Sequence, residues 1–226
     1  MGFSYKRPRM KSLLADPIEQ ELFLKAFPER IEEIVKKGKE KGRKAKILCT
    51  DEAGFRRDGT LHSGWYRKGE IAEIPESNGR FESIKMLGAV DPLEGDFTLK
   101  KAPKRIVSED YGDFLVYLSK RYPDRELIVL EDNAPWHSEK RVWKVLKDNE
   151  IDNVHRIRFP KYSPKMNSCE KLWKWLRESV THCRYHESLK DLMACIWSFY
   201  RRVWRDKEKA KIRFQSEIPI FSNLAL

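Results

Sequence analysis

The sequence has no hydrophobic run long enough to cross a membrane and no closely paired cysteines. None of its apolar stretches approaches the roughly 18 consecutive residues that a membrane span requires. Residues 1–10 are basic, but no apolar segment follows them, so they do not form a secretory signal. The 4 cysteines include no C-x-x-C pair, and the possible ligands His182, Cys183 and His186 lack a partner cluster. These absences predict a cytoplasmic or nucleoid-associated protein with free thiols.

The net charge of +11 is distributed unevenly along the chain. Residues 1–46 hold 13 Lys and Arg against 7 Asp and Glu, residues 47–155 hold 17 against 21, and residues 156–215 hold 16 against 6. An acidic middle therefore lies between two basic flanks. An enzyme that cuts a polyanion needs this combination, because basic flanks bind phosphates and an acidic pocket binds metal ions. The alternative is that basic runs, such as residues 36–46, are solvated helix faces.

The spacing of apolar residues predicts an α/β protein with one domain and an appendage. The predicted strands cover residues 46–50, 64–74, 81–91, 97–101, 127–130 and 154–159. The predicted helices cover residues 18–42, 108–121, 138–149, 167–182 and 187–206, after a basic extended arm over residues 1–17. We expect Pro28 to mark a break in the first helix or a new first turn. We expect residues 75–79 to form a turn between two antiparallel strands. Strands followed by alternating helices and strands indicate a mixed sheet flanked by helices.

Two of the predicted strands end in an acidic residue, Asp51 and Asp132. In open α/β sheets, ligands bind beyond the carboxyl ends of the strands, so adjacent strands would direct both carboxylates into one crevice. Glu170 begins a helix that could cover this crevice. Three carboxylates repel one another unless a cation lies between them, and hard oxygen ligands select Mg²⁺ or Mn²⁺. Two such ions can activate a nucleophile and stabilise the leaving oxygen of a phosphodiester.

Each of these acids also has a simpler structural interpretation. Asp51 and Asp132 fit turns at strand ends, and residues 167–170 fit a helix capping box in which Glu170 reaches back to Asn167. Four other acids occupy comparable positions: Glu52, Glu131, Asp110 and Asp113.

Five segments around the three acids form a recognisable set. They are residues 50–55 (TDEAGF), the pairs at 64–65 and 68–69 (GW and KG), residues 88–89 (GA), residues 130–137 (LEDNAPWH) and residues 159–173 (FPKYSPKMNSCEKLW). Together they resemble the DDE endonuclease domain of insertion-sequence transposases related to the mariner superfamily. The last segment is the most specific, since it follows the pattern Pro-x-Tyr-Ser-Pro-x-x-Asn-x-x-Glu-x-x-Trp. The resemblance extends over about residues 1–205.

This resemblance implies an RNase H-like fold in which Asp51, Asp132 and Glu170 are the catalytic, metal-binding triad. It implies two Mg²⁺ or Mn²⁺ ions, transposon ends and target DNA as partners, and a homodimer or larger assembly on DNA. We expect residues 1–45 to be a basic arm and helical lead-in, 46–206 the catalytic domain and 207–226 a C-terminal tail. Relatives carry helix-turn-helix domains before the catalytic domain, and this chain resembles the catalytic half only, from a split or frameshifted frame or a truncated copy.

Several residues near the triad are candidates for DNA contact. They are Trp136, His137, Lys161, Tyr162, Lys165, Lys174 and Arg177. The cations could hold phosphates on either side of the cut or form a salt-bridged solvent face, and the aromatic residues could stack on an unpaired base or pack in the core. The histidine could bond an active-site group or be purely structural.

The prediction from sequence is a transposase catalytic domain that cleaves DNA and transfers the strand at transposon ends. Two alternatives remain open. One keeps the fold and makes the protein an RNase H-like nuclease. The other is a non-catalytic remnant that binds DNA or dimerises with a full-length transposase.

Overall fold

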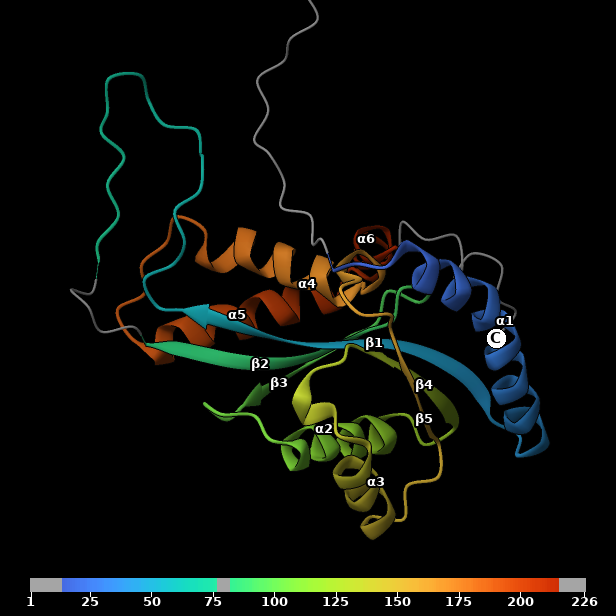
Figure 1. Ribbon diagram of the computed structural model, residues 1–226. Helices are drawn as coiled ribbons and strands as arrows, with labels where there is room; N and C mark the ends of the chain where they lie inside the picture. The colour runs from blue at the N-terminus through green and yellow to red at the C-terminus, as the bar shows by residue number, and fades with distance from the viewer. Residues whose placement is uncertain (1–13, 77–81, 216–226) are drawn as a thin grey trace, which may run out of the picture.

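The computed structural model describes residues 14–76 and 82–215, which form a five-stranded sheet with helices on both faces (Figure 1). The strands are β1 (Lys44–Arg56), β2 (Ser83–Val90), β3 (Phe97–Ala102), β4 (Arg125–Glu131) and β5 (Val154–Arg158). The helices are α1 (Pro17–Glu40), α2 (Ser108–Arg121), α3 (Glu139–Asp148), α4 (Cys169–Leu176), α5 (Leu189–Trp204) and α6 (Lys207–Phe214). Short 3-10 turns occupy Pro135–His137 and Pro164–Met166, and a π-helical turn, Arg177–Thr181, follows α4.

The sheet is mixed, with strand order β3-β2-β1-β4-β5. β1 changes its partner along its length, because its pairing with β4 is parallel and ends at Cys49, opposite Leu130. From Cys49 onward β1 continues beside the antiparallel strand β2 as far as Arg56. The prediction that β1 ends at Asp51 is therefore wrong, although the parallel part of the strand does stop just before this residue.

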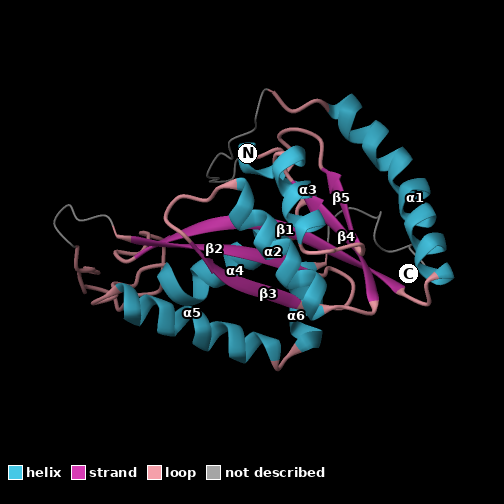
Figure 2. Cartoon of the chain, turned by 90° about the horizontal axis from the view of Figure 1, so that it is seen from below, coloured by secondary structure: helices cyan, strands magenta, loops and turns pink. Residues whose placement is uncertain are grey.

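Helices cover the two faces of the sheet unequally. Alternation along β1 directs Leu48 toward α2 and α3, and directs Ile47 and Cys49 toward α1. The half of the sheet around Phe55 is buried under α4, α5 and α6. Figure 2, seen from below, shows α2 and α3 crossing the sheet, with α1 near β4 and β5 and α5 beyond β2 and β3. The observed architecture is the predicted RNase H-like mixed sheet flanked by helices.

The helix α1 continues through Pro28, so the predicted break at this residue is wrong. Proline inside a helix costs about 3 kcal/mol. Phe27 and Ile31, the apolar residues on either side, are each only 1% exposed, and burying such a side chain gains about 1.5–3 kcal/mol. Packing of this face therefore offsets the lost helix bond.

The predicted strand over residues 64–74 is absent from the structure, where this stretch is an irregular loop. Its alternating pattern leaves Trp65 104% and Ile71 85% exposed, so the pattern corresponds to no buried face. Part of the predicted turn at 75–79, and most of the predicted arm at 1–17, fall outside the described residues. Within the described part of that arm, Asp16 caps α1 by accepting hydrogen bonds from Ile18 N and Glu19 N.

The remaining elements lie close to the predicted positions, and one helix was not predicted. α6 falls in the expected tail and buries Ala210 and Phe214 against the core beneath α4 and α5. All four cysteines are free thiols, as expected. None of the helices in residues 14–76 and 82–215 has the length and hydrophobicity of a membrane span.

Candidate active site

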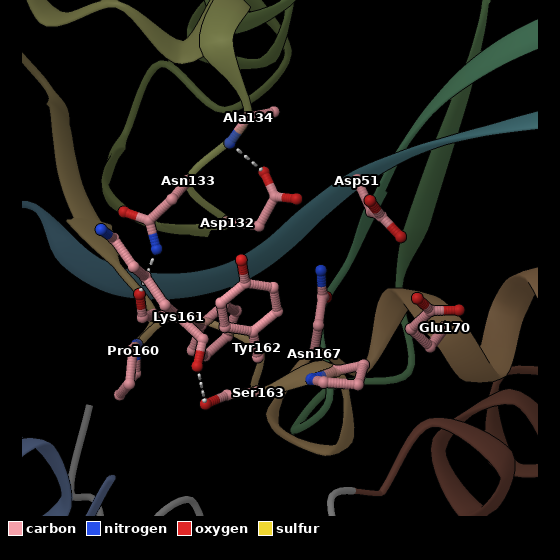
Figure 3. A pocket seen from close by; sticks show the side chains of 12 residues that line it. Asp51, Asp132, Asn133, Ala134, Pro160, Lys161, Tyr162, Ser163, Asn167 and Glu170 are labelled. Atoms are coloured by element: carbon pink, nitrogen blue, oxygen red, sulfur yellow. Dashed lines mark hydrogen bonds between the residues drawn. The ribbon is translucent and has the colours of Figure 1, made fainter. Parts of the chain in front are cut away.

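A pocket of about 410 Å³ lies just beyond the point where the pairing of β1 with β4 ends. Asp51, Asp132 and Glu170 all line it. We call it the carboxylate pocket. The three side chains arrive from β1, from the residue after β4 and from the first turn of α4 (Figure 3). Lys161 and Tyr162 line another part of the same pocket. The three acids singled out in the sequence thus share one site.

Asp51 is fixed by a tryptophan of the facing helix. Trp173 Nε1 donates a hydrogen bond of 2.9 Å to Asp51 Oδ2. The partner of Asp51 on β2 is Gly88, and a Cβ there would lie 2.5 Å from the Trp173 ring. Burial raises the pKa of Asp51 to about 8, and the charges of Glu170 and Glu52 act in the same direction.

Asp132 is held through one of its two carboxylate oxygens. Oδ1 accepts a hydrogen bond from Ala134 N at 3.0 Å and lies 3.0 Å from His137 Nδ1, which also donates to the carbonyl oxygen of Asp132 at 3.1 Å. Burial alone would raise the pKa of Asp132, but these hydrogen bonds outweigh it and lower the pKa. The second oxygen is turned toward the Asp51 side of the pocket (Figure 3).

Glu170 reaches the pocket because Asn167 ties the start of α4 to β1. Asn167 Nδ2 donates to Thr50 O at 3.0 Å, and its Oδ1 accepts from Cys169 N at 3.0 Å. Glu170 faces the pocket, so the capping-box alternative does not describe its side chain. Partial burial raises the pKa of Glu170, Arg177 opposes this change, and Asp132 adds to it.

The three carboxylates fit a divalent cation by their chemistry, although their present positions are not those of a closed ligand shell. The charge of Glu170 raises the pKa of Asp51, and the charge of Asp132 raises the pKa of Glu170. A cation between the carboxylates would relieve this repulsion. Among the residues that the structure describes, no three His, Cys, Asp or Glu side chains surround one point as metal ligands do.

Behind Asp132, a buried ion pair fixes the histidine that holds it. Glu131 accepts from Arg156 Nη2 at 2.5 Å and from Arg156 Nε at 3.0 Å, and Arg158 Nε lies 3.6 Å from its Oε1. Both arginines donate to the carbonyl oxygen of His137, at 2.8 and 2.6 Å. Glu131 therefore belongs to the supporting framework, and the acid next to it in sequence enters the pocket.

Tyr111 of α2 connects this framework to β1. Its hydroxyl donates to Glu131 Oε2 at 2.7 Å and shares a 2.8 Å hydrogen bond with Thr50 Oγ1, one residue before Asp51. A single buried side chain thus joins the segments that carry two of the three pocket acids.

The candidate DNA-contact residues divide into three groups. Lys161 and Tyr162 line the carboxylate pocket, and Tyr162 is 52% exposed. His137 is 1% exposed and bonds Asp132, while Trp136 packs against the core beneath α2 and α3. The other three do not line the pocket. Lys165 is exposed on a 3-10 turn, and Lys174 Nζ lies 4.0 Å from Glu178. The Arg177 guanidinium lies 5.6 Å from the centre of the Phe55 ring.

Sequence reasoning missed three contributors to the site. Trp173 is a buried core residue, and its indole nitrogen also holds Asp51. Asn133 donates to Phe159 O at 2.8 Å, and Asn167 joins α4 to β1. Their signal lay in the quoted segments, where an amide follows Asp132 and precedes Glu170 at short spacing.

The histidines and cysteine of residues 182–186 form no metal site in the described chain. His182 stacks on His62 with ring centroids 4.5 Å apart, and Cys183 Sγ exchanges hydrogen bonds with the backbone of His62. His186 bonds Val180 O at 2.9 Å. The contacts of His182 and Cys183 with His62 hold the loop of residues 57–76 against the end of the π-helical turn.

The strand order and helical layers define the class as RNase H-like. The catalytic domain of the Mos1 mariner transposase has the same fold, with a TM-score of 0.53 and 14% identity over 93% of this chain and 95% of that one. The DDE superfamily endonuclease family matches residues 46–193. The chain therefore belongs to the DDE superfamily endonucleases.

Larger Mos1 structures give similar superpositions. The pre-cleavage Mos1 transpososome and the Mos1 mariner paired-end complex with Mn each have a TM-score of 0.60 and 18% identity, covering 95% of this chain. The chain spans 66% of the Mos1 chain in each, slightly under two thirds. No curated protein sequence matches the chain.

Proposed function

We propose that the chain is the catalytic part of a transposase that cuts DNA at transposon ends and joins the freed strand to target DNA. One observation carries this proposal: three acids from separate elements, Asp51, Asp132 and Glu170, line a single pocket. Family membership and the fold shared with Mos1 complexes support it. We assign these three acids as ligands of two Mg²⁺ or Mn²⁺ ions.

When bound, divalent ions supply Lewis-acid activation of the attacking hydroxyl and stabilise charge on the leaving oxygen. Asp51 would be presented with one oxygen already fixed by Trp173, and Asp132 with one oxygen fixed by Ala134 N and His137. These bonds leave fewer side-chain rotations to restrict when the ligand set forms, which is preorganisation. Lys161 lies at the pocket wall, where its charge would stabilise a phosphate near the cut.

The decisive test replaces Asp132 with asparagine, which keeps shape and removes the charge. We expect Asp132→Asn to abolish nicking of supercoiled plasmid DNA in Mg²⁺ or Mn²⁺ while leaving DNA affinity intact. The matched control is Asp113→Asn, because Asp113 is an exposed acid on α2 away from the pocket. Nicking by Asp132→Asn at the parental rate would refute the assignment.

Substrate choice separates the transposase from a general RNase H-like nuclease. We expect DNA duplex to be cut in preference to an RNA–DNA hybrid, and the reverse preference would transfer the assignment to a ribonuclease. Assembly of two or more copies on DNA, with end recognition by a helix-turn-helix part, belongs to the same proposal. Light scattering of the chain with and without duplex DNA tests the assembly.

A further inference from the structure

A second hollow lies beside the carboxylate pocket, on the face of the sheet that carries α2 and α3. Its volume is about 330 Å³, and Lys85 from β2, Arg105 from the approach to α2, and Arg141 from α3 line it together with Trp136. We call it the basic hollow. The short segment 132–136 borders both spaces, since its first residues line the carboxylate pocket and its last residues line the basic hollow.

The charge of the basic hollow does not follow from local composition. All three cations belong to residues 47–155, where 21 Asp and Glu outnumber 17 Lys and Arg. Three separate elements nevertheless bring Lys85, Arg105 and Arg141 together without an acid in the lining. Within residues 14–76 and 82–215, none of the three forms a salt bridge. The charges of Arg105 and Arg141 are therefore available to an anionic ligand, whereas Lys85 also interacts with Glu52.

Trp136 lines the basic hollow four residues after Asp132 in the chain. Its ring packs against the core beneath α2 and α3, which fixes its orientation. Its Nε1 lies near the Glu52 carboxylate, yet neither Nε1 nor Glu52 Oε2 has a hydrogen bond of normal geometry. Burial raises the pKa of Glu52, and the charge of Lys85 acts in the opposite direction. Cations beside an aromatic side chain are the combination with which proteins follow a nucleic-acid strand, since the cations bind its backbone and the ring can stack on a base.

We propose that the basic hollow binds a backbone phosphate of the same DNA strand that enters the carboxylate pocket. This inference rests on the proposed function, because it assumes DNA in that pocket. Four residues of chain, from Asp132 to Trp136, span at most about 14 Å. A DNA strand advances about 3.4 Å per nucleotide along the duplex axis. The bound phosphate therefore lies within about four nucleotides of the scissile one.

The test neutralises the two exposed arginines in the full-length chain. We expect Arg105→Gln/Arg141→Gln to weaken binding of a duplex oligonucleotide by at least about tenfold, since each charge-assisted bond to a phosphate is lost. The slope of log affinity against log salt should fall by about one for each contact removed. Fluorescence anisotropy between low and moderate salt measures both quantities.

The matched control is Lys36→Gln/Lys39→Gln. Both lysines are exposed cations on α1, in the helical layer on the opposite face of the sheet. An equal loss of affinity in the control and in the arginine variant would overturn the proposal, because it would reveal general attraction to a basic surface. Unchanged affinity in the arginine variant would overturn it as well.

Uncharged methylphosphonate linkages locate the contact. Single replacements along one strand should weaken binding by the wild-type chain at one or two positions within about four nucleotides of the cut. The arginine variant should be insensitive at those positions. Sensitivity only at more distant positions would contradict the inference.

Failure of this inference can be told apart from failure of the proposed function. If Asp132→Asn still nicks DNA but the arginine variant loses affinity, the basic hollow stands as a DNA site and the catalytic assignment fails. If Asp132→Asn is inactive while the arginine variant binds and nicks normally, the catalytic assignment stands and the basic hollow carries no phosphate.

Discussion

At the residue scale, Asp51 is a pocket acid whose environment favours the protonated form. Burial raises its pKa to about 8, so near neutral pH a cation must displace a proton to be bound. We expect the apparent affinity for Mn²⁺ to rise as the pH increases from about 6.5 to about 8.5 and then to level off. Calorimetry in buffers of different ionisation enthalpy measures the proton released. A pH-independent affinity without proton release would contradict this.

Variants of Glu131 and Arg156 distinguish the contribution of this ion pair to protein stability from its role in positioning His137 beside Asp132. Glu131→Leu leaves Arg156 buried without its partner, which should cost about 3–5 kcal/mol of unfolding free energy. The double change Glu131→Leu/Arg156→Leu should regain most of that stability. Nicking should nevertheless stay low in the double variant, because the His137 carbonyl loses one of its two arginine donors.

Urea unfolding and plasmid nicking measure the two effects independently. Full recovery of nicking in the double variant would show that Glu131 and Arg156 support only the fold. A single variant as stable as the parent would contradict the buried-pair argument itself.

At the scale of elements, the close packing of α4 on β2 depends on Gly88. A Cβ at this position would lie 2.5 Å from the Trp173 ring, so Gly88→Ala should cost about 1–3 kcal/mol through overpacking. It should also weaken Mn²⁺ binding, because Trp173 is displaced from Asp51. The matched control is Gly54→Ala on β1, where an added Cβ meets nothing within 4 Å. Equal stability and metal affinity in the two variants would contradict this account.

Local patterns predicted most elements, but they gave the wrong end for β1 and a strand over residues 64–74 that is absent. The α2 range of 108–121 follows directly from its apolar spacing, and β4 from its unbroken apolar run. The continuation of β1 beyond Asp51 depends on antiparallel pairing with β2, a long-range contact that no local pattern reveals. The exposed alternation of residues 64–74 mimics a strand for the opposite reason, since a period of two does not show whether a partner exists.

The three acids of the candidate site could be predicted from the sequence, but the residues that hold them in place could not. Asp51, Asp132 and Glu170 stood in quoted segments whose spacing is specific. The framework around Glu131 joins α2, β4 and β5, and only the fold brings these elements together. Trp173 looked like any core tryptophan, because a hydrogen bond from a buried indole leaves no sequence pattern.

At the scale of the whole molecule, a buried lysine ties β1 to the turn between β2 and β3. Lys46 is 2% exposed and lies 2.6 Å from both Asp91 and Glu94. Burial alone would lower the pKa of Lys46, but Asp91 and Glu94 outweigh it and raise the pKa above its usual 10.5. This contribution to stability is complete below pH 10.5 and is lost as the pH rises through the folded-state pKa.

We therefore expect Lys46→Met to cost about 3–5 kcal/mol near neutral pH, because Asp91 stays buried without its cation. The difference from the parent should narrow above about pH 10.5 as the parent lysine loses its proton. Urea unfolding at a series of pH values measures both, with the exposed Lys39→Met as the control. A difference that stays constant to pH 11 would contradict the assignment of the stabilising charge to Lys46.

The parting of β1 from β4 at Cys49 is a main-chain event and needs no acidic side chain. It follows that a protein with Asp51, Asp132 and Glu170 all changed to amides would keep its hollow and its basic surroundings. If the proposed function holds, we expect such a chain to bind DNA without cutting it. Such a variant would allow the DNA that the protein binds to be captured uncut and identified.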